Sequence, residues 1–260
     1  MSGEPTVSVV MPCYDEEANL RRGVLESVAR FAEATDYCRE VLVVDDGSRD
    51  ASADLVAAFA ATHPEFRLLR EPHRGKAGAI LAGVAAASGD YVLFCDVDQA
   101  TPIDELASFR PYMLAGIDVL VGSRAGRREG APLARRLMAR GYILVRRLVL
   151  DLGGITDSQC GFKAFRREAI QRIARSLQVY RPGAQQARGA TVTAAFDAEL
   201  LFLARRLGYS MKEVPVRWHH VGTKRVHPLI ESWRSLRGLL RIRLNAAQGR
   251  YPSPRRGADR

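Results

Sequence analysis

The sequence predicts an α/β protein with a mostly parallel sheet flanked by helices, followed by C-terminal amphipathic helices. Between residues 6 and 122, short apolar runs rich in β-branched and aromatic residues alternate with helical segments. The turns that join them are short, which is typical of βαβ units. Two of the apolar runs end on acidic pairs, and these indicate a ligand site at the carboxyl edge of the sheet.

The first half of the chain contains the predicted parallel strands and their connecting helices. Each strand is a short apolar run bounded by turn residues or charged residues. An acidic start such as Asp15-Glu16-Glu17 suits the positive N-terminal end of a helix. We expect strands at 6–11, 40–44, 66–69, 91–95 and 118–121. We expect four helices between them: one that begins at residue 15, one at 50–61, one that ends near residue 88 and one at 103–114.

After residue 122 the pattern changes, because an Arg- and Gly-rich loop follows the last of these strands. Helical spacing of apolar residues then returns, with basic residues on the other faces. From residue 247 the tail is rich in Pro, Arg and Gly and is expected to be a disordered basic segment. We expect a helix at 132–150, a short strand within 156–165, a helix at 196–207, a strand at 209–218 and a helix at 228–244.

Composition bounds the class of protein. The chain has 260 residues, of which 47% are hydrophobic and 26% charged, as expected for a soluble protein with one large domain. Its net charge of +10 is uneven, because basic residues gather in 124–147 and 217–260. This asymmetry indicates an anionic partner, which is a membrane surface, a phosphorylated substrate or a nucleic acid. The alternative is that the excess of basic residues serves only to keep the protein soluble.

Cysteine usage and the N-terminus indicate a cytoplasmic protein. The cysteines have no Cys-x-x-Cys spacing, which argues against a zinc site or a disulfide framework and favours free thiols. The N-terminus lacks the features of a signal peptide, and no apolar run reaches the ~18–20 residues that cross a bilayer. Any membrane association is therefore expected to be peripheral, on the cytoplasmic face. The cysteines are Cys13, Cys38, Cys95 and Cys160.

Asp96 and Asp98 are the central candidate site residues. They end the apolar run that begins at Tyr91, and a buried charge without a partner is costly, so both must lie where the strand emerges. Two hard oxygen ligands there suit Mg²⁺ or Mn²⁺. A solvated pair that caps a helix is the alternative. Asp45 and Asp46 end a second strand and are predicted to lie on the same edge of the sheet.

Two common nucleotide-binding motifs are missing from this sheet. The predicted order is Rossmann-like, but the Gly-x-Gly-x-x-Gly fingerprint of dinucleotide binding does not occur in it. A P-loop is also absent, because Gly75-Lys76 is followed by Ala77 and the upstream glycine is missing. The acidic strand ends therefore remain as the main signal of a nucleotide site.

The predicted helix at 228–244 is amphipathic and basic. A basic helix with a Trp in its apolar stripe suits the headgroup region of an anionic membrane. A surface helix that packs on the sheet is the alternative. The stripe consists of Leu229, Trp233, Leu236 and Leu240, flanked by Arg234, Arg237 and Arg241.

Several motifs, in order along the chain, resemble family 2 glycosyltransferases. The resemblance extends from about residue 6 to residue 245, and its later motifs are similar to the dolichyl-phosphate (polyprenyl-phosphate) β-glucosyltransferase branch. The motifs of the whole family are at 10–17 (Pro12-Cys13-Tyr14-Asp15-Glu16 at its centre), 43–48 (Val43-Val44-Asp45-Asp46-Gly47-Ser48) and 96–98 (Asp96-Val97-Asp98). Those of the branch are at 122–124, 157–163, 196–201, 216–218 and 222–224.

The resemblance implies a GT-A fold and a metal-dependent, inverting transfer of a sugar, with UDP-glucose as the leading donor, to a polyprenyl phosphate. It implies one domain over 1–246, with a nucleotide-sugar-binding half at about 6–122 and an acceptor-binding half at 123–246. The implied donor-binding residues are Pro12, Tyr14, Glu16, Asp45, Asp46, Lys76 and Asp96, and the implied metal ligands are Asp96 and Asp98.

The sequence departs from the family pattern at two places. Asp15 stands where the family usually has Asn, and Ala100 stands where mannosyl-phosphate synthases have Gln, with Gln99 just before it. The second difference argues against a mannosyl-phosphate synthase. It also leaves the third protein ligand of the metal unassigned.

The acceptor site is predicted from the chemistry of a lipid phosphate, which is already anionic and needs orientation more than deprotonation. Arg pairs bidentately with phosphate. We expect Arg124, with Arg135 or Arg136 and with Arg140 nearby, to bind it. Asp157 is the candidate for ordering the acceptor site, or else a loop cap, and Lys163 either neutralises phosphate or is a surface residue. The expected catalytic residues are Asp98, Asp157 and Arg124.

Two other functions remain open at this point. A family 2 enzyme can act on a hydroxyl of a saccharide or small molecule, or use GDP-mannose or UDP-N-acetylglucosamine. A basic nucleic-acid-binding protein is the remote alternative, but its arginines would lack interleaved aromatic residues for base stacking. The aligned carboxylates would also repel phosphates without a metal. We therefore expect no nucleic-acid partner.

Overall fold

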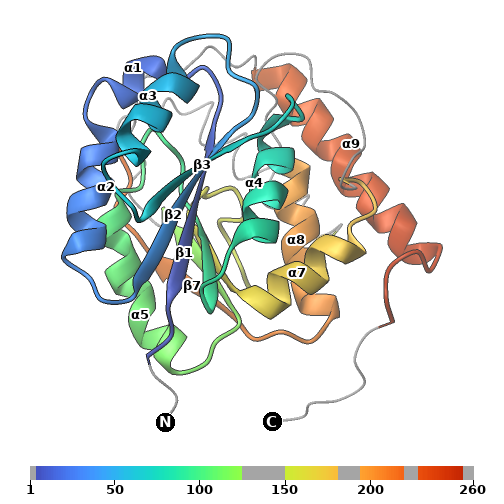
Figure 1. The fold of residues 1–260 in the computed structure, drawn as a ribbon. Coiled ribbons are helices and arrows are strands. Elements are labelled where there is room, and N and C mark those ends of the chain that lie inside the picture. The colour runs from blue at the N-terminus through green and yellow to red at the C-terminus, as the bar shows by residue number, and fades with distance from the viewer. Residues whose placement is uncertain (1–3, 125–149, 181–193, 220–227, 254–260) are drawn as a thin grey trace.

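A seven-stranded, mostly parallel sheet forms the centre of the protein, seen here in a computed structural model that describes residues 4–124, 150–180, 194–219 and 228–253 (Figure 1). The strand order is β3-β2-β1-β4-β6-β5-β7, and only β6 runs antiparallel to its neighbours. The strands are β1 (Val7–Cys13), β2 (Cys38–Asp45), β3 (Phe66–Arg70), β4 (Tyr91–Phe94), β5 (Val119–Ser123), β6 (Lys163–Arg166) and β7 (Met211–Pro215). The predicted α/β class is confirmed.

Helices cover both faces of this sheet, as Figure 1 shows. On one face lie α1 (Glu17–Leu20), α2 (Val24–Glu33), α3 (Ser52–Ala60), a 3-10 turn (Ile103–Glu105) and α5 (Leu106–Leu114). On the other lie α4 (Gly75–Ala86), α7 (Arg167–Ser176), α8 (Ala194–Arg206) and α9 (Pro228–Ala247). The sheet is therefore buried on both sides, which explains why its central strands are apolar along their whole length.

Strand alternation divides the interior into two cores. Val10 and Val44 face the core under α4, whereas Val9 and Val43 face the core under α2. All four are fully buried, and burying a valine side chain contributes roughly 1.5–3 kcal/mol. Parallel pairing of β1 with β2 and β4 brings their carboxyl ends to one edge, which is where the acidic residues follow.

The structure differs from the sequence prediction in three places. Pro12 does not end the first strand, because β1 continues to Cys13. The helix α7 was not anticipated, although Ile170 and Ile173 are fully buried in it. Order also continues past residue 246: the buried Tyr251 donates a hydrogen bond of 2.6 Å to Glu199. The predicted helix at 132–150 and the end of the tail, 254–260, lie outside the described residues.

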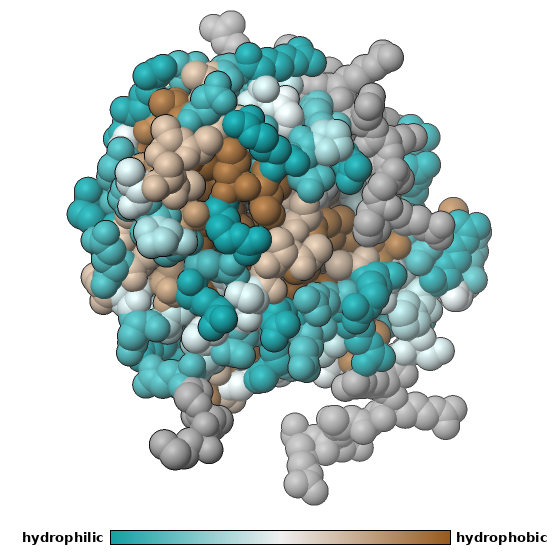
Figure 2. Space-filling model, viewed as in Figure 1, coloured by the Kyte–Doolittle hydropathy of each residue, from teal (hydrophilic) through white to brown (hydrophobic). Residues whose placement is uncertain are grey.

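In the described ranges, no helix is both long and apolar enough to cross a bilayer. On the face seen in Figure 2, apolar residues gather in a band across the middle, over β3 and α4, and polar residues form most of the margin.

Candidate active site

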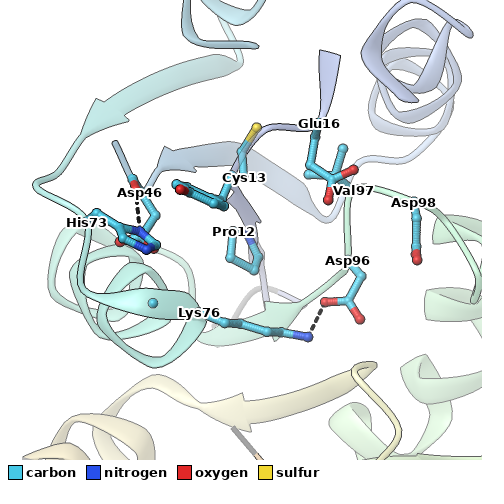
Figure 3. A pocket seen from close by; sticks show the side chains of 11 residues that line it. Pro12, Cys13, Glu16, Asp46, His73, Lys76, Asp96, Val97 and Asp98 are labelled. Atoms are coloured by element: carbon cyan, nitrogen blue, oxygen red, sulfur yellow. Dashed lines mark hydrogen bonds and ion pairs between the residues drawn. The ribbon is translucent and has the colours of Figure 1, made fainter. Parts of the chain in front are cut away.

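A pocket of about 200 Å³ opens at the carboxyl ends of β1, β2 and β4 (Figure 3). Its walls come from the ends of these strands and from the start of α4. The lining residues are Pro12, Cys13, Tyr14, Glu16, Asp46, His73, Gly75, Lys76, Asp96, Val97 and Asp98. Most of the residues predicted to bind the donor are therefore brought together in one place.

Lys76 and Asp96 face each other across one end of this pocket, as Figure 3 shows. The Lys76 ammonium donates a hydrogen bond to Asp96 Oδ1. Burial disfavours the charged form of Asp96, but the charge and hydrogen bond of Lys76, with the more distant charges of Lys163 and Arg124, outweigh burial and lower the pKa of Asp96. Asp96 is therefore an anion at neutral pH, held by a cation from the first turn of α4.

The negative charge of Asp98 is less well compensated by neighbouring groups than that of Asp96. Its carboxylate accepts the Ala100 N–H at 3.0 Å. Burial, together with the nearby charge of Asp96, raises the pKa of Asp98 above its ordinary value. A cation held by the two carboxylates would offset both causes of this shift, because a nearby positive charge favours the ionised form.

Gln99 shapes the turn that carries the two aspartates. It has a left-handed backbone, with φ of 50°. Its amide donates to Cys95 Sγ at 3.1 Å and to the Asp96 carbonyl at 3.1 Å, and its Oε1 accepts the Ile103 N–H at 2.9 Å. Both ends of the amide are thus used in holding the loop, so Gln99 is not available as the third protein contact of a metal in this arrangement.

The opposite end of the pocket is built from Tyr14, Asp46 and His73. The rings of Tyr14 and His73 stack, with centroids 4.1 Å apart and planes at 16°. His73 Nδ1 lies 2.8 Å from Asp46 Oδ2, and Asp46 Oδ1 accepts the Arg74 N–H at 2.7 Å. This is a flat aromatic surface beside a fixed carboxylate, which suits a nucleobase and its ribose. Sequence reasoning missed His73, because its partner is distant in the chain.

Between these two ends, Pro12, Cys13 and Glu16 form the wall of the pocket. Burial raises the pKa of Cys13 to about 12, so its thiol stays protonated and is a poor nucleophile. Glu16 accepts a hydrogen bond of 2.5 Å from Asn19. Asp45 does not line the pocket: it is buried and accepts the Ser48 N–H at 3.2 Å, so it orders the turn after β2.

Arg124 and Asp157, both predicted at the acceptor site, bind each other. Arg124 Nε and Nη2 donate to the two carboxylate oxygens of Asp157, each at 2.7 Å, and the Arg124 N–H donates at 3.0 Å. The guanidinium also lies 5.7 Å from the centre of the Trp218 ring. Burial works against both charges, but the pairing raises the pKa of Arg124 and lowers that of Asp157.

Lys163 is buried, which corrects the expectation that it neutralises an acceptor phosphate or lies on the surface. Its side chain is 0% exposed. Its ammonium donates to Asp197 Oδ1 at 2.7 Å and to the Cys160 carbonyl. Lys163 pairs with Phe94 in the sheet and is therefore held close behind Asp96. Its positive charge helps to lower the pKa of Asp96, although its buried ammonium does not reach the pocket surface.

Gly161 brings this second half of the chain directly against Asp96. A methyl group at Gly161 would overlap the Asp96 carboxylate, with its Cγ only 2.9 Å away. The loop that contains Arg124's partner Asp157 thus ends in a residue that makes room for a candidate metal ligand. Gly161 lies inside the motif at 157–163, but nothing in that motif indicates a contact with Asp96.

The remaining predicted acceptor residues, Arg135, Arg136 and Arg140, lie outside the described residues. Arg124 and Asp157 do not line the pocket, although Arg124 contributes to the electrostatic field at Asp96. Most residues of the predicted donor side therefore lie together in the pocket. The predicted acceptor side lies partly outside the described residues.

The pocket chemistry fits a divalent cation of the Mg²⁺ or Mn²⁺ type. Asp96 and Asp98 supply hard oxygen atoms on one wall, which are the protein ligands that such ions take when substrate phosphates complete the shell. Within the described ranges no group of three or more His, Cys, Asp or Glu side chains could hold a metal. The described residues therefore do not form a metal site built from protein side chains alone. They are compatible with a site in which two carboxylates and the phosphates of a substrate share the metal.

Comparison with known proteins points to the same chemistry. Residues 8–174 match the family described as glycosyl transferase family 2. A dolichyl-phosphate beta-glucosyltransferase of Trichomonas vaginalis is 34% identical over 86% of this chain and 66% of its own length. The protein of the same name from Dictyostelium discoideum is 30% identical over 94% of this chain and 75% of its own. This chain thus spans about two thirds to three quarters of these relatives.

Solved structures agree with these sequence matches. Glucosyl-3-phosphoglycerate synthase of Mycobacterium tuberculosis, in complex with Mn²⁺ and UDP-glucose, superposes with a TM-score of 0.60 and is 26% identical. The similarity covers 96% of this chain and 80% of that one. Mannosyl-3-phosphoglycerate synthase of Rubrobacter xylanophilus has the same fold, with a TM-score of 0.65 at 19% identity.

Proposed function

Because the chain belongs to glycosyl transferase family 2 and has the expected GT-A fold, we propose that it transfers glucose from UDP-glucose to a polyprenyl or dolichyl phosphate. The observation that carries this proposal is the pocket in which Asp96, Asp98 and Lys76 face the Tyr14–His73 stack. The first group suits a diphosphate and the second a nucleoside. Both relatives described above are named for glucosyl transfer to dolichyl phosphate.

The donor is assigned from the shape and charge of the two pocket ends. Tyr14 and His73 offer a stacking surface for uracil, and the fixed Asp46 carboxylate lies beside it as an acceptor for base or ribose donors. At the other end, Lys76 and the N-terminal end of α4 favour the diphosphate. The M. tuberculosis synthase, solved with UDP-glucose and Mn²⁺, supports glucose as the sugar, ahead of GDP-mannose or UDP-N-acetylglucosamine.

Asp96 and Asp98 are the residues that would hold Mg²⁺ or Mn²⁺. Such a cation, when bound, supplies Lewis-acid stabilisation of the charge on the leaving diphosphate. Lys76 adds a second positive charge, because its ammonium lies at the same carboxylate. The protein contributes a pocket in which these charges are already oriented before the reaction.

A phosphate acceptor explains why the acceptor side has paired carboxylates. A hydroxyl acceptor needs a general base, and such a base works best with a pKa near the operating pH. Arg124 binds both oxygens of Asp157 and lowers its pKa against the effect of burial, and Asp197 is bound to Lys163. Asp157 is therefore poorly suited to take up a proton, and Asp197 is already bound to an ammonium, whereas the attacking oxygen of an anionic lipid phosphate needs no base.

Association with the cytoplasmic face of a membrane follows from this acceptor, because the phosphate of a polyprenyl lipid lies at a bilayer surface. The basic surface of the chain, with its net charge of +10, supports peripheral contact with anionic lipids. Arg124 is proposed to reach the phosphate with the donors that Asp157 does not occupy, together with Arg135, Arg136 or Arg140.

The proposal is tested by incubating purified protein with radiolabelled nucleotide sugars and a short polyprenyl phosphate in detergent. We expect label from UDP-glucose, and much less from GDP-mannose or UDP-N-acetylglucosamine, to enter the organic phase when Mn²⁺ or Mg²⁺ is present. Chelation by EDTA should abolish transfer, and excess Mg²⁺ should restore it. Binding or hydrolysis of UDP-glucose with no lipid product would instead favour the hydroxyl-acceptor alternative, and absence of donor binding would exclude the transferase.

A further inference from the structure

The helix α9 packs against the protein with only one of its two apolar faces. Figure 1 shows it along the outside of α8, at the edge of the molecule opposite α2. Leu239 and Ile242 are fully buried on its inner face. Gly238 lets the two helices approach closely, because a methyl group there would overlap the Cβ of Ala195. Among the described side chains of α9, those of the inner face therefore pack it on α8.

The outer face carries a second apolar pair. Leu240 and Leu244 are 53% and 56% exposed, which makes them two of the three large hydrophobic residues that are exposed in the described chain. They are four residues apart, so they lie one above the other on the same side of the helix. The alternative role of the predicted stripe, packing on the sheet, does not apply to Leu240, which faces solvent.

Exposed arginines flank this leucine pair on both sides. At 100° per residue, Arg237 and Arg241 lie on one side of the line through the leucines and Arg243 lies on the other. None of the three forms an ion pair with a described residue, and residues 232–258 contain no acidic side chain. The face is thus an apolar centre with an uncompensated positive border.

This combination favours a lipid bilayer over the other possible partners. Leucines can enter the boundary between headgroups and acyl chains while the arginine side chains extend to anionic headgroups. A second copy of the chain packed symmetrically on this face would place its arginines against like charges. A nucleic acid would use the arginines but leave the leucines exposed. Charge complementarity therefore indicates an anionic membrane.

We propose that the α9 outer surface, formed by Arg237, Leu240, Arg241, Arg243 and Leu244, docks the protein on an anionic bilayer. The proposal rests on the proposed function in one respect, since a polyprenyl phosphate acceptor gives this docking its purpose. Binding to vesicles needs neither donor nor acceptor, however, so docking and transfer can fail independently. Docking keeps the enzyme at the surface where its acceptor is present and leaves the chemistry of the pocket unchanged.

Co-flotation with vesicles tests the proposal. Wild-type protein should partition onto phosphatidylcholine vesicles containing 30% phosphatidylglycerol at least about tenfold more than onto pure phosphatidylcholine, and salt should weaken this binding. Leu240→Ser/Leu244→Ser and Arg237→Gln/Arg241→Gln/Arg243→Gln should each reduce the partition coefficient about tenfold or more. Transfer to a short polyprenyl phosphate in detergent should stay within about twofold of wild type in both variants.

Matched controls separate docking from general hydrophobicity and charge. Leu114→Ser removes the third exposed leucine, which is 54% exposed on α5, and Arg21→Gln/Arg22→Gln/Arg30→Gln removes the same number of charges from the turn after α1 and from α2. Both controls should bind anionic vesicles within about twofold of wild type. Equal losses in the controls, equal binding to both kinds of vesicle, or a dimer that Leu240→Ser/Leu244→Ser dissociates would each overturn the proposal. Thermal unfolding of every variant checks that the fold is intact.

Discussion

Lys76→Met is expected to lower kcat/KM for UDP-glucose by about 10²–10³-fold, because it removes a preorganised positive charge at the diphosphate end of the pocket. The same variant is expected to bind Mn²⁺ more tightly than wild type when no nucleotide is present. Lys76 hydrogen-bonds Asp96 Oδ1 and lies within the pocket that both residues line. A cation that approaches Asp96 therefore competes with the ammonium and is repelled by it.

These opposite effects follow from one contact and are measured separately. Mn²⁺ affinity is read from the electron paramagnetic resonance signal of the free ion, and UDP affinity from calorimetry. Lys76→Arg is the control, because it keeps the charge and should preserve most of the UDP affinity. Parallel weakening of Mn²⁺ and UDP in Lys76→Met would show that Lys76 supports the metal site and does not compete with it.

Gly161→Ala is expected to lower kcat/KM by about 10²-fold, because displacement of a reacting or ligand group by about 1 Å costs that much. The new methyl would overlap the Asp96 carboxylate, with the Cγ at 2.9 Å. The carboxylate has to rotate or move away, since the loop is fixed next to the sheet by Lys163, which holds the Cys160 carbonyl. Mn²⁺ affinity should fall together with activity.

A double-mutant cycle shows whether this loss acts through Asp96. In an Asp96→Asn background the metal ligand is already impaired, so adding Gly161→Ala should bring little further loss of kcat/KM or of Mn²⁺ affinity. Ser158→Ala, in the same loop, is the control for general disturbance of this segment. Additive losses in the cycle, with a lowered unfolding midpoint for Gly161→Ala alone, would mean that the glycine serves only folding.

Local patterns were sufficient to predict that most of the proposed donor-binding residues meet in one pocket. Asp96 and Asp98 follow a short apolar run, and a charge at such a place has to emerge at the end of a strand. Parallel pairing then determines that Asp46, which follows another strand, lies at the same edge. Strand ends and burial decide these positions, and both depend on residues that are neighbours in the sequence.

Contacts between distant segments could not be predicted in this way. His73 binds Asp46 and stacks on Tyr14, yet no spacing rule connects these three positions. Arg124 and Asp157 were assigned to an acceptor from their residue types, and the fold joins them to each other. Buried Lys163 shows the same difficulty, because its charge is compensated by Asp197 from another element.

The helix α9 shows a different limit of pattern reading. Its sequence has leucines on more than one face, so the apolar stripe that includes Leu240 is compatible either with contact to a membrane surface or with packing on the sheet. The packed side in the structure is instead that of Leu239 and Ile242. Only the position of α8 decides between these faces, and that position depends on tertiary contacts.

The most direct measurement compares two acceptors that differ only in the phosphate. Purified protein is given UDP-glucose, Mg²⁺ and either a polyprenyl phosphate or the polyprenol of the same chain length, in the same detergent. We expect glucosyl transfer to the phosphate at a rate at least about 10³-fold above that to the alcohol, because the described acceptor-side carboxylates are paired and provide no base. Comparable transfer to the polyprenol would contradict it, since a hydroxyl acceptor requires a base that the proposed mechanism does not contain.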